Sequence, residues 1–311
     1  MSRADGAPGP TAPDRDLAAG TVTVRVPATS ANLGPGYDSF GLALDRWDEV
    51  RGSLQDGVQV TVEGVGTGQL PLDGRHLVVR AVAAAWTAAG RQLPGLRLHG
   101  VNRIPHGGGQ GSSAAAIVSG LLLGRALLPD PSVLSDQRLL ELGTAMEGHP
   151  DNVAPALSGG LTLAFTARDG RPRAVHGAVH PAVRAVLFTA STGSSTHHTR
   201  SLLPAVVPHA DAAANAATAA LLWHALTAEP ALLFEATVDR LHQAYRAPEM
   251  PASAALLLTL RDAGVPAVLS GAGPSVLVLT DRPVPSELLR HNGFTVDPVP
   301  ISALGGVVTA G

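Results

Sequence analysis

The stretch "PHGGGQGSSAAA", residues 105–116, places four glycines and two serines directly ahead of an alanine run. The start of a helix carries free backbone N–H groups and a partial positive charge, and glycine lets the backbone approach an anion closely. Serine hydroxyls there can bind a phosphate or a magnesium ion. The stretch therefore predicts a phosphate loop that opens a helix over residues 112–128. It also fits a plain flexible turn before a buried helix.

The chain contains no lysine, because all 22 of its basic residues are arginines. Walker-type phosphate loops, protein kinases and Schiff-base enzymes all use a lysine. These classes are therefore excluded in their usual form. A phosphate loop in this chain would depend on backbone amides, a helix dipole and serine hydroxyls.

The composition describes a globular chain of 311 residues, long enough for two domains, with 45% hydrophobic and 15% charged residues. A net charge of −3 gives no electrostatic reason to expect nucleic acid or a membrane as partner. The absence of cysteine excludes disulfides, iron–sulfur clusters and thiolate zinc sites, and is consistent with the cytoplasm.

The N-terminal residues 1–20 are polar and rich in proline, glycine and alanine. They lack the apolar core of roughly 7–15 residues that a secretory signal needs, and we expect a disordered tail. No stretch of the sequence approaches the ~18 consecutive apolar residues of a membrane span.

Patterns along the rest of the chain alternate between strands and helices. Residues 21–26 alternate as a strand that Pro27 should end, and further strands are expected over 40–54, 58–64 and 95–105. Helices are expected over 76–89 and over 135–148, the latter with Ser135 as N-cap and Gly148 as its stop. From about residue 180, a strand, a polar loop, helices over 211–228 and 251–264, and a strand–glycine loop–strand unit follow. Because the spacing is not that of regular βαβ units, we expect an α+β fold with two domains.

Several polar clusters are candidate sites with open alternatives. In "HPDN" (149–152), His149 and Asp151 could be metal ligands, a general base with its orienting partner, or part of a helix cap. Glu141 and Glu147, on the preceding helix, could lie on a solvated helix face, or a glutamate there could supply a carboxylate to magnesium. "LSGAGPS" (269–275) could be a simple hairpin turn.

Other residues suit an amino acid as ligand. Asn32 and Asp38 bracket a Gly-Pro-Gly turn, so they could serve the turn itself or hold a cationic amine. Arg200, four residues after Thr196, and Arg246 could bind a carboxylate in a bidentate manner, or could be ordinary surface arginines.

Taken together, "VPATSANLGPGYDSFGLAL", "GGGQGSSAAA", "EGHPDNVAPAL" and "SGAGPS" closely resemble the three signature regions of the GHMP small-molecule kinases, over about residues 21–280. Within that family, the first motif and "HPDN" most resemble the homoserine kinases. The resemblance implies a two-domain α+β fold: a ribosomal-S5-domain-2-like domain over 21–175 and a ferredoxin-like domain over 176–311. It implies that MgATP lies over the glycine loop in the cleft between them, and that its γ-phosphoryl group is transferred to the hydroxyl of L-homoserine on the route to threonine. It also implies a homodimer.

The resemblance also implies roles for individual residues. The nucleotide would be bound by Pro105, Gly107, Gly108, Gly109, Gln110, Gly111, Ser112, Ser113 and Ala114. Magnesium would be held by Ser113 and Glu141. The acceptor would be bound by Asn32, Asp38, His149, Asp151, Thr196, Arg200, Arg246 and Gly271. Catalysis would involve His149, Asp151, Asn152 and Arg200.

Homoserine kinases are thought to act largely by positioning, so the resemblance implies that no side chain is an obligatory general base. The chain departs from the family where Gln110 replaces a usual leucine, and His197 and His198 are unexpected. Three other functions remain open: a kinase for a related amino alcohol or another small alcohol, an inactive GHMP fold that serves as a binding protein, and an α+β protein that binds no nucleotide.

Overall fold

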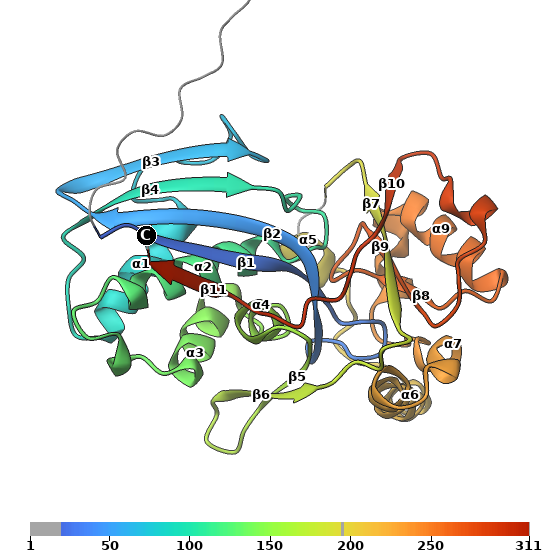
Figure 1. Cartoon of the computed structure of the whole chain (residues 1–311). Coiled ribbons are helices and arrows are strands. Elements are labelled where there is room, and N and C mark those ends of the chain that lie inside the picture. The colour runs from blue at the N-terminus through green and yellow to red at the C-terminus, as the bar shows by residue number, and fades with distance from the viewer. Residues whose placement is uncertain (1–19, 194–195, 311) are drawn as a thin grey trace, which may run out of the picture.

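The computed structural model describes residues 20–193 and 196–310, which form two domains of mixed helices and strands (Figure 1). Apart from Gly20, the predicted tail therefore lies outside the described residues. The α+β class and the division into two domains are confirmed.

The first domain is built on a mixed sheet in the order β11-β1-β2-β4-β3, in which β5 pairs with β2 and with β6. The pairs are antiparallel except for the parallel pair of β3 and β4. Its strands are β1 (Val22–Ala31), β2 (Phe40–Leu54), β3 (Gly57–Gly64), β4 (Gly95–Asn102), β5 (Leu161–Thr166), β6 (Pro172–Gly177) and β11 (Val307–Ala310).

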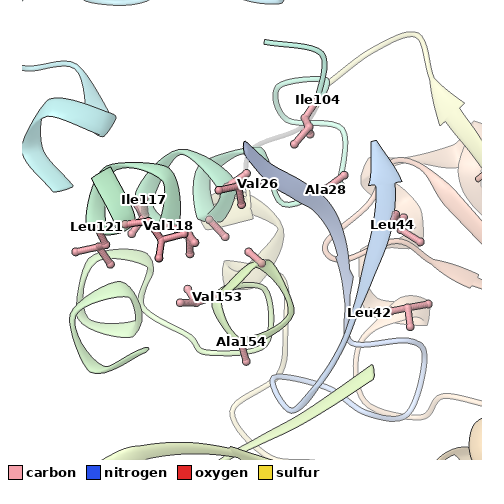
Figure 2. Close-up of a cluster of buried hydrophobic side chains, with 14 of the residues drawn as sticks. Val26, Ala28, Leu42, Leu44, Ile104, Ile117, Val118, Leu121, Val153 and Ala154 are labelled. Carbon is pink, nitrogen blue, oxygen red and sulfur yellow. The ribbon is translucent and has the colours of Figure 1, made fainter. Parts of the chain in front are cut away.

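Helices pack on one face of this sheet, below it in Figure 1. They are α1 (Leu77–Ala88), α2 (Ser112–Ala126), α3 (Asp136–Glu147) and α4 (Val153–Ser158), with the 3₁₀ turn η1 (Pro131–Val133) before α3. Figure 2 labels apolar side chains of one buried cluster, to which β1, β2, α2 and α4 all contribute: Val26, Ala28, Leu42, Leu44, Ile117, Val118, Leu121, Val153 and Ala154. Burying these side chains fixes α2, and with it the glycine loop, against the sheet.

Local signals explain where some elements begin and end. The Ser135 hydroxyl accepts a hydrogen bond from the backbone N–H of Arg138 at 3.2 Å, and Gly148 ends α3 with a φ of 94°. Both predicted caps of this helix are confirmed. The prediction that Pro27 ends the first strand is wrong, because the register shifts between Pro27 and Ala28 and β1 continues to Ala31. A proline is tolerated at such a bulge because the bulge needs no ladder bond from its nitrogen.

The second domain has an antiparallel sheet in the order β10-β7-β9-β8. Its strands are β7 (Arg184–Ala190), β8 (Ala267–Leu269), β9 (Val276–Thr280) and β10 (Phe294–Pro298). When the strands are numbered 1 to 4 within this domain, their order is 4-1-3-2, which is that of a ferredoxin-like sheet, as expected. Its helices are α5 (Thr196–Ser201), α6 (His209–Thr227), α7 (Leu233–Ala236), α8 (Gln243–Arg246) and α9 (Pro251–Asp262), with 3₁₀ turns η2 (Pro230–Leu232), η3 (Ala247–Glu249) and η4 (Ser286–Leu289).

The predicted domain limits are wrong at two places. The boundary at 175/176 falls inside β6, which pairs with β5 as far as Gly177. The C-terminal segment leaves the second domain, since Ile301 bridges to Leu44 and β11 pairs with β1 from Val22 onward. The sequence of a short apolar segment such as "VVTA" does not show which strand it pairs with. Dividing the sequence into two consecutive domains could therefore not assign this segment to the first one.

Candidate active site

The glycine loop runs directly into α2, with Gly111 as the N-cap residue at a φ of 66°. The first intrahelical hydrogen bond is donated by Ala115 to the carbonyl of Gly111. The amides of Ser112, Ser113 and Ala114 precede that bond and have no acceptor within the helix, so they can face an anion. The Ala114 side chain is buried in the core, and its backbone N–H is what it can offer to a phosphate.

The "SGAGPS" loop of the second domain presses against the glycine loop. The Ser270 hydroxyl donates to the carbonyl of Gly109 at 2.7 Å, and the N–H of Gly271 donates to the carbonyl of Ala31 at 3.1 Å. The Gly271 carbonyl in turn accepts from the side-chain amide of Asn32 at 2.8 Å. The loop is therefore more than a hairpin turn, because it joins the two domains beside the phosphate loop.

Gly109 can only be glycine if this contact is kept. Its φ is 71°, and a Cβ there would stand 2.2 Å from the Ser270 carbonyl oxygen. Gly68 has a similar φ of 75° with open space around it, so it is a matched control for backbone strain alone.

We expect Gly109→Ala to weaken ADP binding at least about tenfold, because the loop must shift away from Ser270. Gly68→Ala should cost only about 1–2 kcal/mol of stability from its left-handed backbone and leave ADP affinity unchanged. Calorimetric titration with ADP and thermal unfolding of both variants measure this. Equal effects of the two substitutions on ADP binding would contradict the close contact.

A cavity of about 400 Å³ opens beside the glycine loop. Along α2 it is lined by Ser112, Ala116 and Ser119, which lie on one face of the helix. With a rise of 1.5 Å per residue, these positions extend the cavity about 10 Å from the helix start. Apolar walls come from Val50, Leu70, Pro71, Leu77 and Val78.

The far end of this cavity holds polar atoms without partners. Both ring nitrogens of His76 and the hydroxyl of Ser119 are buried, with no hydrogen bond among the described residues. Burial also lowers the pKa of His76, which keeps its ring neutral at pH 7. Buried polar groups are normally satisfied, so these atoms face a ligand position. Sequence reasoning missed both residues, since each reads as an ordinary helix position.

Glu147 lies at the phosphate end of the cavity. The Ser113 hydroxyl donates to its carboxylate at 2.5 Å, and burial is the main cause that raises the pKa of Glu147. The predicted partner, Glu141, instead accepts hydrogen bonds from Arg138 and Gln137 on its own helix. The structure therefore brings Ser113 together with Glu147 and not with Glu141, because α3 presents its last residue, and not its middle, to the start of α2. The sequence held the signal, since Glu147 stands inside the motif "EGHPDN" itself.

His149 and Asp151 are joined at 2.6 Å between Nδ1 and Oδ1, and Asp151 is almost fully buried. Burial opposes the charge of His149, but the hydrogen bond to Asp151 and the charges of Asp151 and Glu147 outweigh it and raise its pKa. The side chain of Asn152 also lines the cavity and accepts from the Thr29 hydroxyl at 2.8 Å.

Asp38 and Arg200, 162 residues apart, form a bidentate ion pair with both distances at 2.7 Å. This pairing raises the pKa of Arg200. Asp38 has a φ of 55°, and its N–H donates to the Asn32 side chain at 2.9 Å. Asn32 therefore links Asp38 to the Gly271 loop. Thr196 is the first residue of α5, the helix that carries Arg200. The side chains of Thr196, His197 and His198 are not among those that the structure describes.

Arg246 is among the largest fully buried side chains, with 1% of its surface exposed. Its Nη1 lies 2.9 Å from His242 Nδ1 and donates weakly to the Gly271 carbonyl at 3.4 Å, while its Nε has no partner among the described residues. Burial lowers the pKa of its guanidinium. Both Arg246 and Arg200 lie close to the ring of Tyr37, with each guanidinium carbon 5.6 Å from the ring centre.

A larger cavity, of about 840 Å³, is lined by residues 158–161, 176–181, 183–185, 298–301 and 303. Among the described residues, none of the predicted site residues lines it. The smaller cavity is lined instead by most of the predicted nucleotide-binding residues, together with His149, Asn152 and Gly271.

Known proteins resemble this chain over most of its length. The family model described as the GHMP kinases N terminal domain matches residues 76–160, and the GHMP kinases C terminal model matches residues 224–293. A protein from Leifsonia xyli named homoserine kinase is 51% identical over 270 residues, which cover 86% of this chain and 83% of that protein. Another of that name from Streptomyces avermitilis is 47% identical, over 93% of this chain and 96% of that protein. The crystal structure of homoserine kinase from Cytophaga hutchinsonii superposes with a TM-score of 0.80 at 25% identity, covering 96% of this chain and 100% of that one.

Proposed function

Since the chain belongs to the GHMP kinase family, we propose that it transfers the γ-phosphoryl group of ATP to the side-chain hydroxyl of L-homoserine. The products would be ADP and O-phospho-L-homoserine, an intermediate of threonine biosynthesis. The chain is an ATP-dependent small-molecule kinase, and the names of its relatives support homoserine as its acceptor.

The observation that carries the choice of acceptor is Arg246. A buried guanidinium that lacks a carboxylate partner is costly, and an anionic ligand would offset that cost. The carboxylate of an amino acid matches the planar fork of arginine and could accept from its Nη groups or from the unpartnered Nε.

The Asp38–Arg200 pair suits the two charges of an amino acid. An arriving zwitterion can offer its ammonium group to Asp38 and its carboxylate to Arg200, which exchanges one ion pair for two. Arg246 also lies near this pair, because both guanidinium groups contact the Tyr37 ring. A neutral alcohol would break the pair without replacing it, so this geometry favours an amino alcohol that carries a carboxylate.

The phosphates would lie on the amides at the start of α2. The side chains that fit Mg²⁺ are Ser113 and Glu147, because hydroxyl and carboxylate oxygens are its preferred ligands and few protein ligands suffice when phosphates supply the rest. Bound there, the ion would neutralise charge on the transferring group. The second oxygen of Glu147 has no partner among the described residues, which supports this assignment.

The transfer forms a bond between the homoserine oxygen and the γ-phosphorus and breaks the bond from that phosphorus to the bridging oxygen of ADP. The hydroxyl proton passes to an oxygen of the transferring phosphoryl group. His149 is poorly suited to accept it, because its raised pKa favours the charged ring, which donates instead. Asp151 accepts from that ring, so we assign the pair to holding the acceptor and the phosphoryl group in line.

The base of ATP would occupy the far end of the cavity. A nucleotide whose phosphates lie at Ser112 reaches about 10 Å along α2 to His76 and Ser119. A neutral imidazole offers one donor and one acceptor to a purine edge. The apolar walls beside it would cover the faces of the base.

We expect His76→Leu to raise the Kd of ADP about tenfold and to leave the Kd of inorganic tripolyphosphate unchanged. Thermal stability should not fall, because the substitution removes two unsatisfied buried nitrogens and no side-chain cap. Calorimetric titration with both ligands tests this, and Gly109→Ala, which should weaken both, is the control. If His76→Leu weakened the binding of tripolyphosphate as much as the binding of ADP, His76 would not lie at the base of the nucleotide.

The proposed acceptor is tested by ADP release in the presence of Mg²⁺ with acceptors that each lack one group. L-Homoserine should be the best substrate. 3-Amino-1-propanol, without the carboxylate, and 4-hydroxybutyrate, without the amine, should each lose at least about 10²-fold in kcat/KM. Preference for another amino alcohol over L-homoserine would instead support a specialised kinase. No turnover with any of these alcohols would support an inactive binding protein.

The homodimer and the cytoplasmic location stay predictions. Across residues 20–193 and 196–310, each helix is too short or too polar to cross a bilayer. Sedimentation equilibrium would decide the assembly, with a mass of twice 31.6 kDa expected for the dimer.

A further inference from the structure

Gln110 is a buried polar residue in the middle of the glycine loop, with 1% of its surface exposed. Its neighbours Gly109 and Gly111 both have positive φ, and between Gly107 and Gly111 it is the one residue with a polar side chain. A buried side-chain amide is stable only when its donor and acceptor are both satisfied. Its partners therefore show what the loop is attached to.

The two ends of the Gln110 amide reach different domains. Its Oε1 accepts from Nη1 of Arg46 in β2 at 2.6 Å, and its Nε2 donates to the hydroxyl of Thr189 in β7 at 3.1 Å. Arg46 also donates through Nη2 to Asp297 in β10 at 3.1 Å. A chain of polar contacts therefore runs Asp297–Arg46–Gln110–Thr189, with both ends in the sheet of the second domain.

The backbone of Gln110 is held separately from its side chain. Its carbonyl accepts from the N–H of Thr29 at 3.0 Å, and the carbonyl of Gly109 accepts from Ser270. Glycine backbones are otherwise free to adopt many conformations, and fixing them costs entropy. A side-chain anchor at the centre of the loop limits that freedom before a ligand arrives.

We propose that Gln110 is a positioning residue that fixes the phosphate loop against the second domain through Arg46 and Thr189. The inference rests on the proposed function, because it assumes that the amides of this loop bind the phosphates of ATP. Gln110 would then act on nucleotide affinity through the loop, without touching the phosphates by its side chain.

The test is equilibrium binding of ADP without the amino acid, measured by calorimetric titration. Gln110→Met keeps the length of the side chain and removes both of its hydrogen bonds, so it should lower the affinity for ADP about tenfold. Thr189 lies across the domain boundary, and Thr189→Val should lower the affinity for ADP about threefold. The double variant should bind no more weakly than Gln110→Met, because the two residues share one contact.

The matched control is Thr280→Val, the same change in the same sheet. Thr280 pairs with Arg184, at the end of β7 opposite Thr189, and among the described residues its hydroxyl bonds only to the backbone of Arg282. Its ADP affinity should be unchanged.

Two results would overturn the inference. If Thr189→Val bound ADP as the wild type does while Gln110→Met bound it weakly, Gln110 would contact the phosphates directly. If both variants only lowered the melting temperature and left ADP affinity unchanged, the contacts would be merely structural. Failure of the wild type to bind ADP at all would count against the proposed function itself, which keeps the two failures distinct.

Discussion

Arg246→Met is expected to lower kcat/KM for L-homoserine about 10²- to 10³-fold without lowering the melting temperature. Removing one partner of a desolvated, hydrogen-bonded charge pair costs about 2–5 kcal/mol in binding, and 1.4 kcal/mol is a factor of ten. The free protein loses the contacts of Arg246 with His242 and Gly271 but no ion pair, because Arg246 has no carboxylate partner among the described residues. Methionine also removes a buried charge, which offsets the loss of those contacts. Steady-state kinetics and thermal unfolding of the same preparation measure both effects.

Arg261→Met is the matched control, with the opposite expected pattern. Arg261 is partly buried and donates to Thr237 Oγ1 at 3.0 Å and to the Phe234 carbonyl at 3.1 Å. Its loss should lower the melting temperature and leave KM for homoserine within about twofold. The penalty of Arg246→Met should also shrink when 3-amino-1-propanol replaces homoserine. A full penalty with that analogue would show that Arg246 does not bind the carboxylate.

Glu147→Gln is expected to lower kcat about 10²-fold and to raise the Mg²⁺ concentration needed for half-maximal activity. A neutral amide is a poor ligand for a hard cation, whose charge stabilisation is worth several kcal/mol to phosphoryl transfer. Because burial raises the pKa of Glu147, the wild type should also need more Mg²⁺ as the pH falls and this carboxylate takes up a proton. Titrations with Mg²⁺ at several pH values measure this, with Mg²⁺-dependent ADP binding as a readout independent of turnover.

Glu141→Gln carries the same change on the same helix and should leave the Mg²⁺ dependence as it is. Glu141 is held by Arg138 and Gln137 at some distance from the cavity, so the substitution weakens only local surface contacts. An effect of Glu141→Gln equal to that of Glu147→Gln would restore the assignment that the sequence favoured.

Local patterns were enough to predict most elements. The strand over 40–54 has both of its predicted limits, and the predicted helix begins at Ser112. These limits could be predicted because apolar alternation, glycine and serine determine the backbone within a few residues. The fold class followed from the same patterns. What the sequence did not reveal is which elements meet, as β11 and β1 show at opposite ends of the chain.

The same holds for the site, where single motif residues could be predicted but the contacts between distant residues could not. Motifs predicted Ser113, Asp38 and Arg200 as site residues, but helical spacing alone could not decide between Glu141 and Glu147, since that choice depends on where α3 meets α2. The unsatisfied atoms of His76 and Ser119 become visible only once burial is known. The role of Gln110 likewise depends on Thr189, which is 79 residues away.

A ³¹P NMR spectrum of the purified protein with MgATP and L-homoserine tests the proposed activity most directly. We expect one new phosphomonoester signal, that of O-phospho-L-homoserine, formed in equal amount with ADP and without inorganic phosphate. ADP accompanied by inorganic phosphate, or a phosphoester that appears only with a different alcohol, would contradict it.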